Sequence, residues 1–161
     1  MKKCATISDC GRYRYTLSRI WDKSKRLVLF IGLNPSTADA KEDDPTIRRL
    51  IRFATDWDFG GMLVGNLFAY RATDPEDLIN SEEPVGRFSN YWLEIMAQKV
   101  GIKVACWGAY GALLKRDEQV LSMLDSFFIF GLTKKGMPKH PLYLPADTEL
   151  IPWTSTGAKL P

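Results

Sequence analysis

Four short apolar runs, separated by segments of helical periodicity, constrain the fold of this 161-residue chain more than any other feature. The runs are residues 27–31, 62–67, 102–107 and 127–130. The first run is apolar at every position, which is typical of a parallel strand covered on both faces. Strands of this kind that alternate with helices predict right-handed crossovers and an α/β fold.

Helix start signals lie between the runs. Asp44-Pro45 and Asp74-Pro75 each place a capping side chain before a proline, which is favoured at the first position of a helix. The segments that we expect to be helical are about 46–57, a short stretch from 75, about 90–100 and 111–125. The predicted fold class is therefore a three-layer α/β/α arrangement around a short four-stranded parallel sheet.

The two ends of the chain depart from this pattern. Residues 3–21 contain the turn signal Asp9-Cys10-Gly11, and residues 13–21 alternate between apolar and polar side chains, which predicts an N-terminal β-hairpin with one wet face. We expect an irregular tail over about residues 145–161. No change of composition marks a boundary, so we expect a single domain over residues 1–161.

Composition excludes several classes of protein. No apolar run approaches the length of a membrane span, and no apolar stretch follows the basic N-terminus as it does in a secretory signal. The three cysteines, Cys4, Cys10 and Cys106, do not form a disulfide framework or a four-ligand metal site. We expect a cytoplasmic protein with reduced thiols, a buried Cys106, no cofactor and no membrane partner.

Positive charge gathers in two segments, although the net charge is only +3. Arginines and lysines crowd residues 12–26, and Lys134, Lys135, Lys139 and His140 crowd a late loop. Basic clusters can contact phosphates. Solvated surface is the simpler interpretation, and we favour it for the first cluster.

Polar loops follow the apolar runs. In an open parallel sheet these loops meet at one edge, and ligands bind there at the point where the strand order reverses. The residues that we expect to bind a substrate at this edge are Gly32, Pro35, Ser36, Thr37, Asn66, Phe68, Arg71, Trp107, Lys134 and Lys139. The convergence of four such loops is the strongest indication of a functional site.

Asn34 and His140 are the candidate catalytic residues. Pro35 stiffens the turn after the first apolar run, so the Asn34 amide can hold a water or a ligand in a defined place. A turn with local side-chain caps fits the same residues equally well. His140 is the only histidine, and it can donate a hydrogen bond to a group that gains negative charge, or it can be an ordinary surface residue.

Aromatic and acidic residues near these loops each allow two interpretations. The aromatic residues, which can stack on a base or close the edge of the core, are Phe68, Tyr70, Trp107 and Tyr110. The acidic residues, which can hold Mg²⁺ or support the helix start, are Asp39, Glu42, Asp43 and Asp44. We favour helix capping by Asp43 and Asp44, and we expect stacking from at least one aromatic ring.

The strings in these loops resemble those of a known family. Over residues 13–19, 32–39 and 140–144 the chain resembles an uncharacterised family of bacteria and phages, the domain of unknown function sixteen forty-three. This resemblance implies no established reaction.

A more distant resemblance is to the uracil-DNA glycosylase superfamily. Gly32-Leu33-Asn34-Pro35 resembles the first motif of its mismatch-specific branch, in which the Asn positions the attacking water. His140 begins a string that resembles the second motif, in which a histidine contacts the base carbonyl, and Asn66 resembles a residue that reads the base edge. Ser36 departs from the first motif, where Gly is expected, and Leu142 departs from the second, where Ser is expected.

The resemblance implies recognition of a nucleobase, either in DNA or RNA or as a free base or nucleotide, and hydrolysis of an N-glycosidic bond. Asn34 would position water, His140 would stabilise the departing base, and nearby lysines would hold phosphates. One alternative is a non-catalytic module that binds nucleic acid or another partner. The other is a Mg²⁺-dependent enzyme that acts on phosphates through the acidic cluster.

Overall fold

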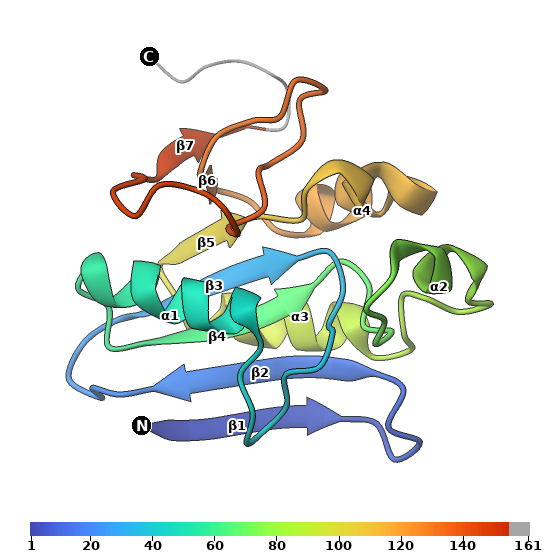
Figure 1. Cartoon of the computed structure of the whole chain (residues 1–161), viewed down its shortest axis with the longest axis horizontal. Helices are drawn as coiled ribbons and strands as arrows, with labels where there is room; N and C mark the ends of the chain where they lie inside the picture. Colours follow the sequence, from blue (N-terminus) through green and yellow to red (C-terminus); the bar gives the residue numbers. More distant parts are fainter. Residues whose placement is uncertain (155–161) are drawn as a thin grey trace.

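A computed structural model describes residues 1–154, and in this part of the chain seven strands form one mixed sheet (Figure 1). The strands are β1 (Lys2–Ile7), β2 (Arg14–Ile20), β3 (Leu27–Gly32), β4 (Gly61–Asn66), β5 (Ile102–Ala105), β6 (Phe127–Ile129) and β7 (Ile151–Trp153). The helices are α1 (Pro45–Asp56), α2 (Pro75–Asn80), α3 (Ser89–Ala97), the 3₁₀ segment η1 (Ala109–Lys115) and α4 (Arg116–Met123). The order across the sheet is β1-β2-β4-β3-β5-β6-β7.

The four apolar runs form the parallel centre of the sheet. β3 pairs with β4 on one side and with β5 on the other, and β6 pairs with β5. The register places Gly32 beside Asn66 and Ile31 beside Ala105. The carboxyl ends of β3, β4 and β5 therefore lie next to one another, which is the condition for a shared site.

The predicted four-stranded parallel sheet was wrong about the extent of the sheet. β2 pairs antiparallel with β4, so the hairpin β1–β2 extends the main sheet, and β7 pairs antiparallel with β6 at the other edge. β7 lies in the tail that we expected to be irregular, whose residues 155–161 fall outside the described part. Both errors have one cause, because a local sequence pattern does not name the distant strand with which a segment pairs.

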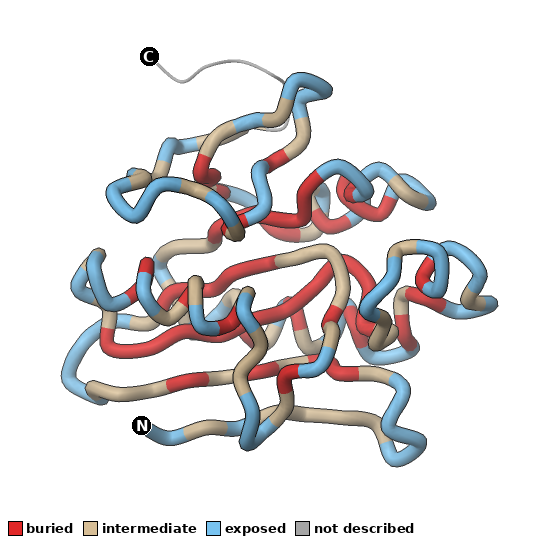
Figure 2. The backbone as a smooth tube through the Cα atoms, in the orientation of Figure 1, coloured by how far each residue is buried: buried red, intermediate tan, exposed pale blue. Residues whose placement is uncertain are grey.

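Helices cover both faces of the sheet. Along β3, Val28 and Phe30 pack against α1, whereas Leu29 and Ile31 face the core that α3 and α4 cover. Figure 2 shows buried residues along the central strands and exposed residues on the outer loops. These two cores form the three layers expected of the α/β class. Among residues 1–154, no helix is both long and apolar enough to cross a bilayer.

Local signals predicted one helix well and another poorly. The Asp44 side chain accepts a hydrogen bond from the Ile47 backbone N–H at 2.8 Å, and α1 begins at Pro45, as predicted. The single helix predicted over 111–125 is instead η1 followed by α4, because Leu114 and Lys115 adopt left-handed φ angles of 54° and 53°. Side-chain periodicity carries no signal for such a backbone change.

Burial alternates along β2 from Tyr15 to Ile20, as its sequence pattern predicted, but its two arginines are not solvated. Arg14 and Arg19 are both buried. Arg19 donates from Nε to Asp43 Oδ1 at 2.7 Å and from Nη2 to the Asp39 carbonyl at 2.6 Å, and Lys3 Nζ lies 2.7 Å from Asp43 Oδ2. This network fastens the loop after β3 to the hairpin. The interpretation of the first basic cluster as solvated surface was therefore wrong for these two arginines.

Candidate functional site

A pocket of about 440 Å³ lies at the carboxyl ends of β3, β4 and β5. The loop after β3 leads to α1 on one face of the sheet, and the loop after β5 leads to η1 and α4 on the other. Adjacent strands whose following helices lie on opposite faces mark the point where the strand order reverses, and open α/β sheets bind ligands there. The volume of the pocket suits a small molecule. The predicted site residues that line this pocket are Gly32, Asn34, Pro35, Ser36, Asn66, Trp107 and His140.

The Asn34 amide group joins two loops at the pocket. Its Nδ2 donates to the Ala72 carbonyl at 2.8 Å and to the Pro35 carbonyl at 3.1 Å, and the Ala72 N–H donates back to the Pro35 carbonyl at 2.9 Å. Both amide hydrogens are therefore used, and Oδ1 is the atom left to accept from a water or a ligand. The geometry fits both interpretations of Asn34, as a turn residue and as a group that positions water.

Asn66 ends β4 with its side chain buried beside the pocket. The residue is 7% exposed, and its Nδ2 has no hydrogen-bond partner among the described residues. A Cβ atom built at Gly32 would lie 2.9 Å from Asn66 Oδ1, so the glycine makes room for this amide. An unpartnered buried donor costs about 1–3 kcal/mol, and an acceptor on a ligand would remove that cost.

His140 stands at the rim of the pocket in an exposed loop. The Leu142 backbone N–H donates to its Nδ1 at 3.2 Å, so the proton of the neutral ring is on Nε2. Desolvation of the ring lowers the pKa of His140 below its ordinary value, and the Asp44 carboxylate acts in the opposite direction. At neutral pH the ring is therefore an uncharged donor through Nε2–H.

The structure corrects the aromatic assignments. Phe68 is fully buried, and Trp107 is 1% exposed with its ring edge-on to Phe127 and Trp153. Neither ring can stack on a ligand, because both already pack in the core. Tyr110 lines the pocket and is 50% exposed, so its ring is available for stacking.

Four other predicted site residues do not line the pocket. Thr37, Lys134 and Lys139 are exposed, and Arg71 donates from Nη1 to the Gly11 carbonyl at 3.3 Å. The two lysines belong to the loop before His140, which the hydrogen bond from the Gly108 N–H to the Pro138 carbonyl holds at 2.9 Å.

Sequence reasoning missed Arg14 as a pocket residue, and it considered Asp44 only for Mg²⁺ binding or helix capping. Arg14 is 3% exposed and donates from Nη1 to the Ala38 carbonyl at 2.8 Å. Burial lowers the pKa of Arg14 to about 10, with Asp44 opposing that shift, so the guanidinium stays charged at neutral pH. Alternation along β2 predicted that Arg14 faces solvent. The pairing of β2 with β4, which the sequence pattern does not show, brings this residue to the pocket.

The acidic cluster serves the local backbone and the hairpin. Asp39 Oδ1 accepts from the N–H groups of Lys41 and Glu42 at 2.7 and 2.9 Å, Asp43 pairs with Lys3 and Arg19, and Asp44 caps α1. Within residues 1–154, no group of three or more His, Cys, Asp or Glu side chains is placed to hold a metal ion. The capping interpretation is confirmed for Asp44 and wrong for Asp43, and these contacts give a Mg²⁺ site no support.

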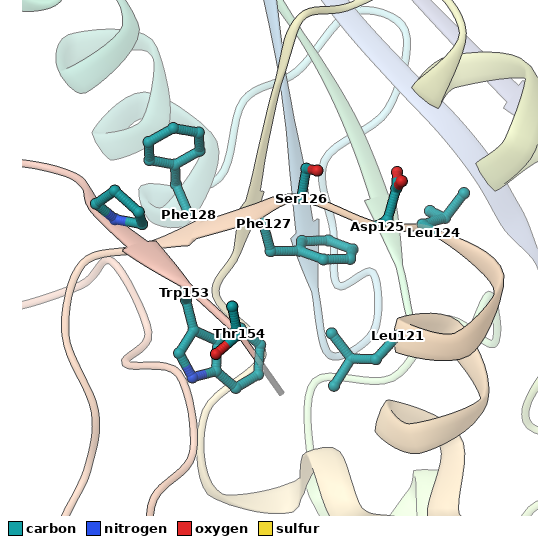
Figure 3. Close-up of a pocket in the computed structure, with 9 residues that line it drawn as sticks. Leu121, Leu124, Asp125, Ser126, Phe127, Phe128, Trp153 and Thr154 are labelled. Carbon is teal, nitrogen blue, oxygen red and sulfur yellow. The ribbon is translucent and has the colours of Figure 1, made fainter. Parts of the chain in front are cut away.

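A second pocket, of about 430 Å³, lies at the amino end of β6 (Figure 3). Its walls are mostly apolar and include Phe127, Phe128 and Trp153, with Asp125 and Ser126 on one side. This is the sheet edge opposite the loops that follow the parallel strands. Because few polar side chains converge there, the first pocket is the better candidate for a functional site.

The cysteines differ strongly in their surroundings. Burial raises the pKa of Cys106 to about 12, as expected for a structural thiol. Cys10 is exposed, and the Ser8 hydroxyl, 3.3 Å from its Sγ, together with Arg12, lowers its pKa to about 7.

We expect iodoacetamide at neutral pH to alkylate Cys10 several-fold faster in the folded protein than in the unfolded protein, because more of its thiol is ionised. Mass spectrometry of peptides after short exposures measures this rate. Ser8→Ala should slow the reaction at Cys10 and leave Cys106 unreacted. Equal rates in the folded and unfolded states would contradict the expectation.

Comparison with known protein families matched residues 14–142 to a family described as protein of unknown function (DUF1643). The chain belongs to this family. All the residues that line the first pocket, from Arg14 to Leu142, fall within the matched segment of DUF1643, whereas the second pocket is lined in part by residues 152–154 beyond it. Neither a curated protein nor a solved structure matched this chain.

Proposed function

We propose that this DUF1643 protein recognises a nucleobase in the first pocket and hydrolyses the N-glycosidic bond that joins the base to its sugar. One observation carries the proposal. Asn34, Asn66 and His140, which follow or end β3, β4 and β6, line the same pocket. Amide and imidazole groups that converge on a small cavity complement the carbonyl and N–H groups of a base.

Asn66 and Tyr110 are the residues that would hold the base. The buried Asn66 amide offers one donor and one acceptor to a base edge, and its Nδ2 still lacks a partner. The half-exposed Tyr110 ring can stack on the base. Exposed Lys134 and Lys139, in the loop that leads to His140, would meet phosphates of a nucleic acid.

Asn34 and His140 would act on the reaction itself. Asn34 Oδ1 accepts a hydrogen bond from the attacking water, whose oxygen bonds to the sugar carbon as the bond from that carbon to the base nitrogen breaks. The electron pair of the broken bond stays on the base, and His140 Nε2–H donates to the base carbonyl where negative charge gathers. A proton of the water finally neutralises the base.

The test is base release by the purified protein. Oligonucleotides of DNA and RNA, single- and double-stranded, would carry uracil, mismatched or damaged bases, and each would be incubated with and without chelator. We expect release that is indifferent to chelator and at least tenfold slower in Asn34→Ala. Asn90→Ala, which removes an exposed asparagine outside the pocket, is the matched control and should match the wild type.

The hydrogen bonds of Asn34 favour a second candidate, a module that binds nucleic acid without turnover. Its amide already links two loops, which is a sufficient role for the residue. Salt-sensitive binding with no base release by the wild type would support this candidate and reject hydrolysis. If the wild type shows neither base release nor binding, both candidate functions are rejected.

A further inference from the structure

Three arginines are buried among residues 1–154, and they differ in how their N–H groups are used. Arg19 pairs with the Asp43 carboxylate and with backbone carbonyls. Arg116 donates to the Leu67 carbonyl, to Gln119 Oε1 and to Ser89 Oγ, at 2.7, 2.6 and 3.2 Å. Each nitrogen of these two guanidinium groups has a partner.

Arg14 is different. Its Nη1 donates to the Ala38 carbonyl, but its Nε is buried and has no hydrogen-bond partner among residues 1–154. No carboxylate of these residues lies within 4.0 Å of the guanidinium. Of these three arginines, Arg14 is also the one that lines the first pocket. A buried cation with an unused donor is costly unless a partner of opposite charge arrives.

The other titratable groups that line the pocket neither form an ion pair with Arg14 nor add a second positive charge. Asp44 lines the pocket, but its Oδ1 accepts the Ile47 N–H at 2.8 Å and its carboxylate stays beyond ion-pair distance of Arg14. His140 is an uncharged donor at neutral pH. Among the residues that line the pocket, Arg14 is therefore the one cation.

We propose that Arg14 binds a negatively charged ligand in the pocket. The ligand is a planar heterocycle that is an anion either when it binds or when the reaction releases it. The inference rests on the proposed function and specifies its ligand. When the N-glycosidic bond breaks, its electron pair goes to the base, and a base that leaves as an anion gains an ion pair with Arg14. His140 then contributes a hydrogen bond, and Arg14 contributes the charge.

The test compares two bases of similar shape by isothermal titration calorimetry at neutral pH. Uracil is neutral under these conditions, whereas the ring of 5-nitrouracil readily loses a proton and becomes an anion. We expect the wild type to bind 5-nitrouracil at least tenfold more tightly, because a hydrogen bond to a charged partner is stronger. Arg14→Met should lose this preference, and Arg14→Lys, which keeps the charge, should retain part of it.

Arg71→Met is the matched control, since it removes the same charge from a neighbouring loop residue that does not line the pocket. It should keep the preference. Thermal unfolding of each variant shows whether it is folded. Equal affinity for the two bases, binding of neither by the wild type, or a preference that survives in folded Arg14→Met would overturn the inference. Competition by inorganic phosphate would assign Arg14 to a phosphate rather than to a ring.

These titrations need no turnover, so they separate this inference from the proposed reaction. A preference for the anion without base release would keep the role of Arg14 and reject hydrolysis. If the protein releases the base and Arg14→Met keeps the preference for the anion, hydrolysis is supported and the role of Arg14 is rejected.

Discussion

Replacing Asp43 by alanine is expected to lower the free energy of unfolding by about 3 kcal/mol. The change leaves the guanidinium of Arg19, which is fully buried, without its carboxylate. The cost lies at the lower end for a broken buried pair because Arg19 keeps its bonds to the Ser18 and Asp39 carbonyls. For a domain of this size, thermal unfolding should shift downward by about 6–12 °C.

Asp56→Ala is the matched control for that measurement. Asp56 also pairs with an arginine, Arg52, but both side chains are exposed, so removing the pair should scarcely change the unfolding temperature. In a background of Arg19→Met, Asp43→Ala should cost much less, because no buried cation remains. Equal losses from Asp43→Ala and Asp56→Ala would contradict the assignment of Arg19 as the source of the effect.

The same carboxylate predicts a dependence of stability on pH. Burial acts to raise the pKa of Asp43, but hydrogen bonds from Lys3 and Arg19 outweigh it and hold the pKa below its ordinary value. Asp43 therefore stabilises the fold above the unfolded-state pKa of about 4, and this contribution is lost as the pH falls through the folded-state value. Asp43→Ala should show a correspondingly weaker loss of stability in acid.

Gly32→Ala is expected to weaken binding of a nucleobase by about a hundredfold, the effect of losing two hydrogen bonds to the ligand. The new Cβ atom would lie 2.9 Å from Asn66 Oδ1, so the amide must leave its place beside the pocket. The φ angle of Gly32 is not in the left-handed region, so alanine fits the backbone itself. Fold stability should change much less than affinity does.

Titration with 5-nitrouracil measures this effect, with Gly101→Ala as the control. A Cβ atom at Gly101 meets no heavy atom within 4 Å, so that variant should bind like the wild type. In a background of Asn66→Ala, Gly32→Ala should add little, because the displaced group is already absent. Full, additive losses in the double variant would show that alanine at position 32 acts on something other than Asn66.

The sequence predicted the parts of the fold that local chemistry determines. The Asp44 cap and the Pro45 start of α1 rest on hydrogen bonds within one turn, and the buried β3 follows from its continuous apolar run. The place of the hairpin beside β4 depends on contacts more than 40 residues apart in the chain, roughly the separation of Leu17 and Val64. Such contacts leave no periodic signal in either segment.

The candidate site shows the same difference between what nearby residues determine and what distant contacts determine. Asn34, Asn66 and His140 were predicted to meet because each is close to the carboxyl end of a parallel strand, and the topology brings those ends together. Phe68 and Trp107 were expected to face a ligand, but which way a ring turns at a strand end depends on the packing beneath it. Arg14 was missed because a charged residue in an alternating strand normally faces solvent.

The antiparallel pairing of β2 with β4 also dictates the order in which the site can be assembled during translation. The hairpin leaves the ribosome before β4, and a two-stranded hairpin alone is marginally stable in water. Until β4 and the loop before α1 emerge, Arg14 and Arg19 have neither the Ala38 carbonyl nor the Asp43 carboxylate to receive them. Both guanidinium groups stay hydrated on the nascent chain, and the pocket closes only when the segment that carries His140 arrives.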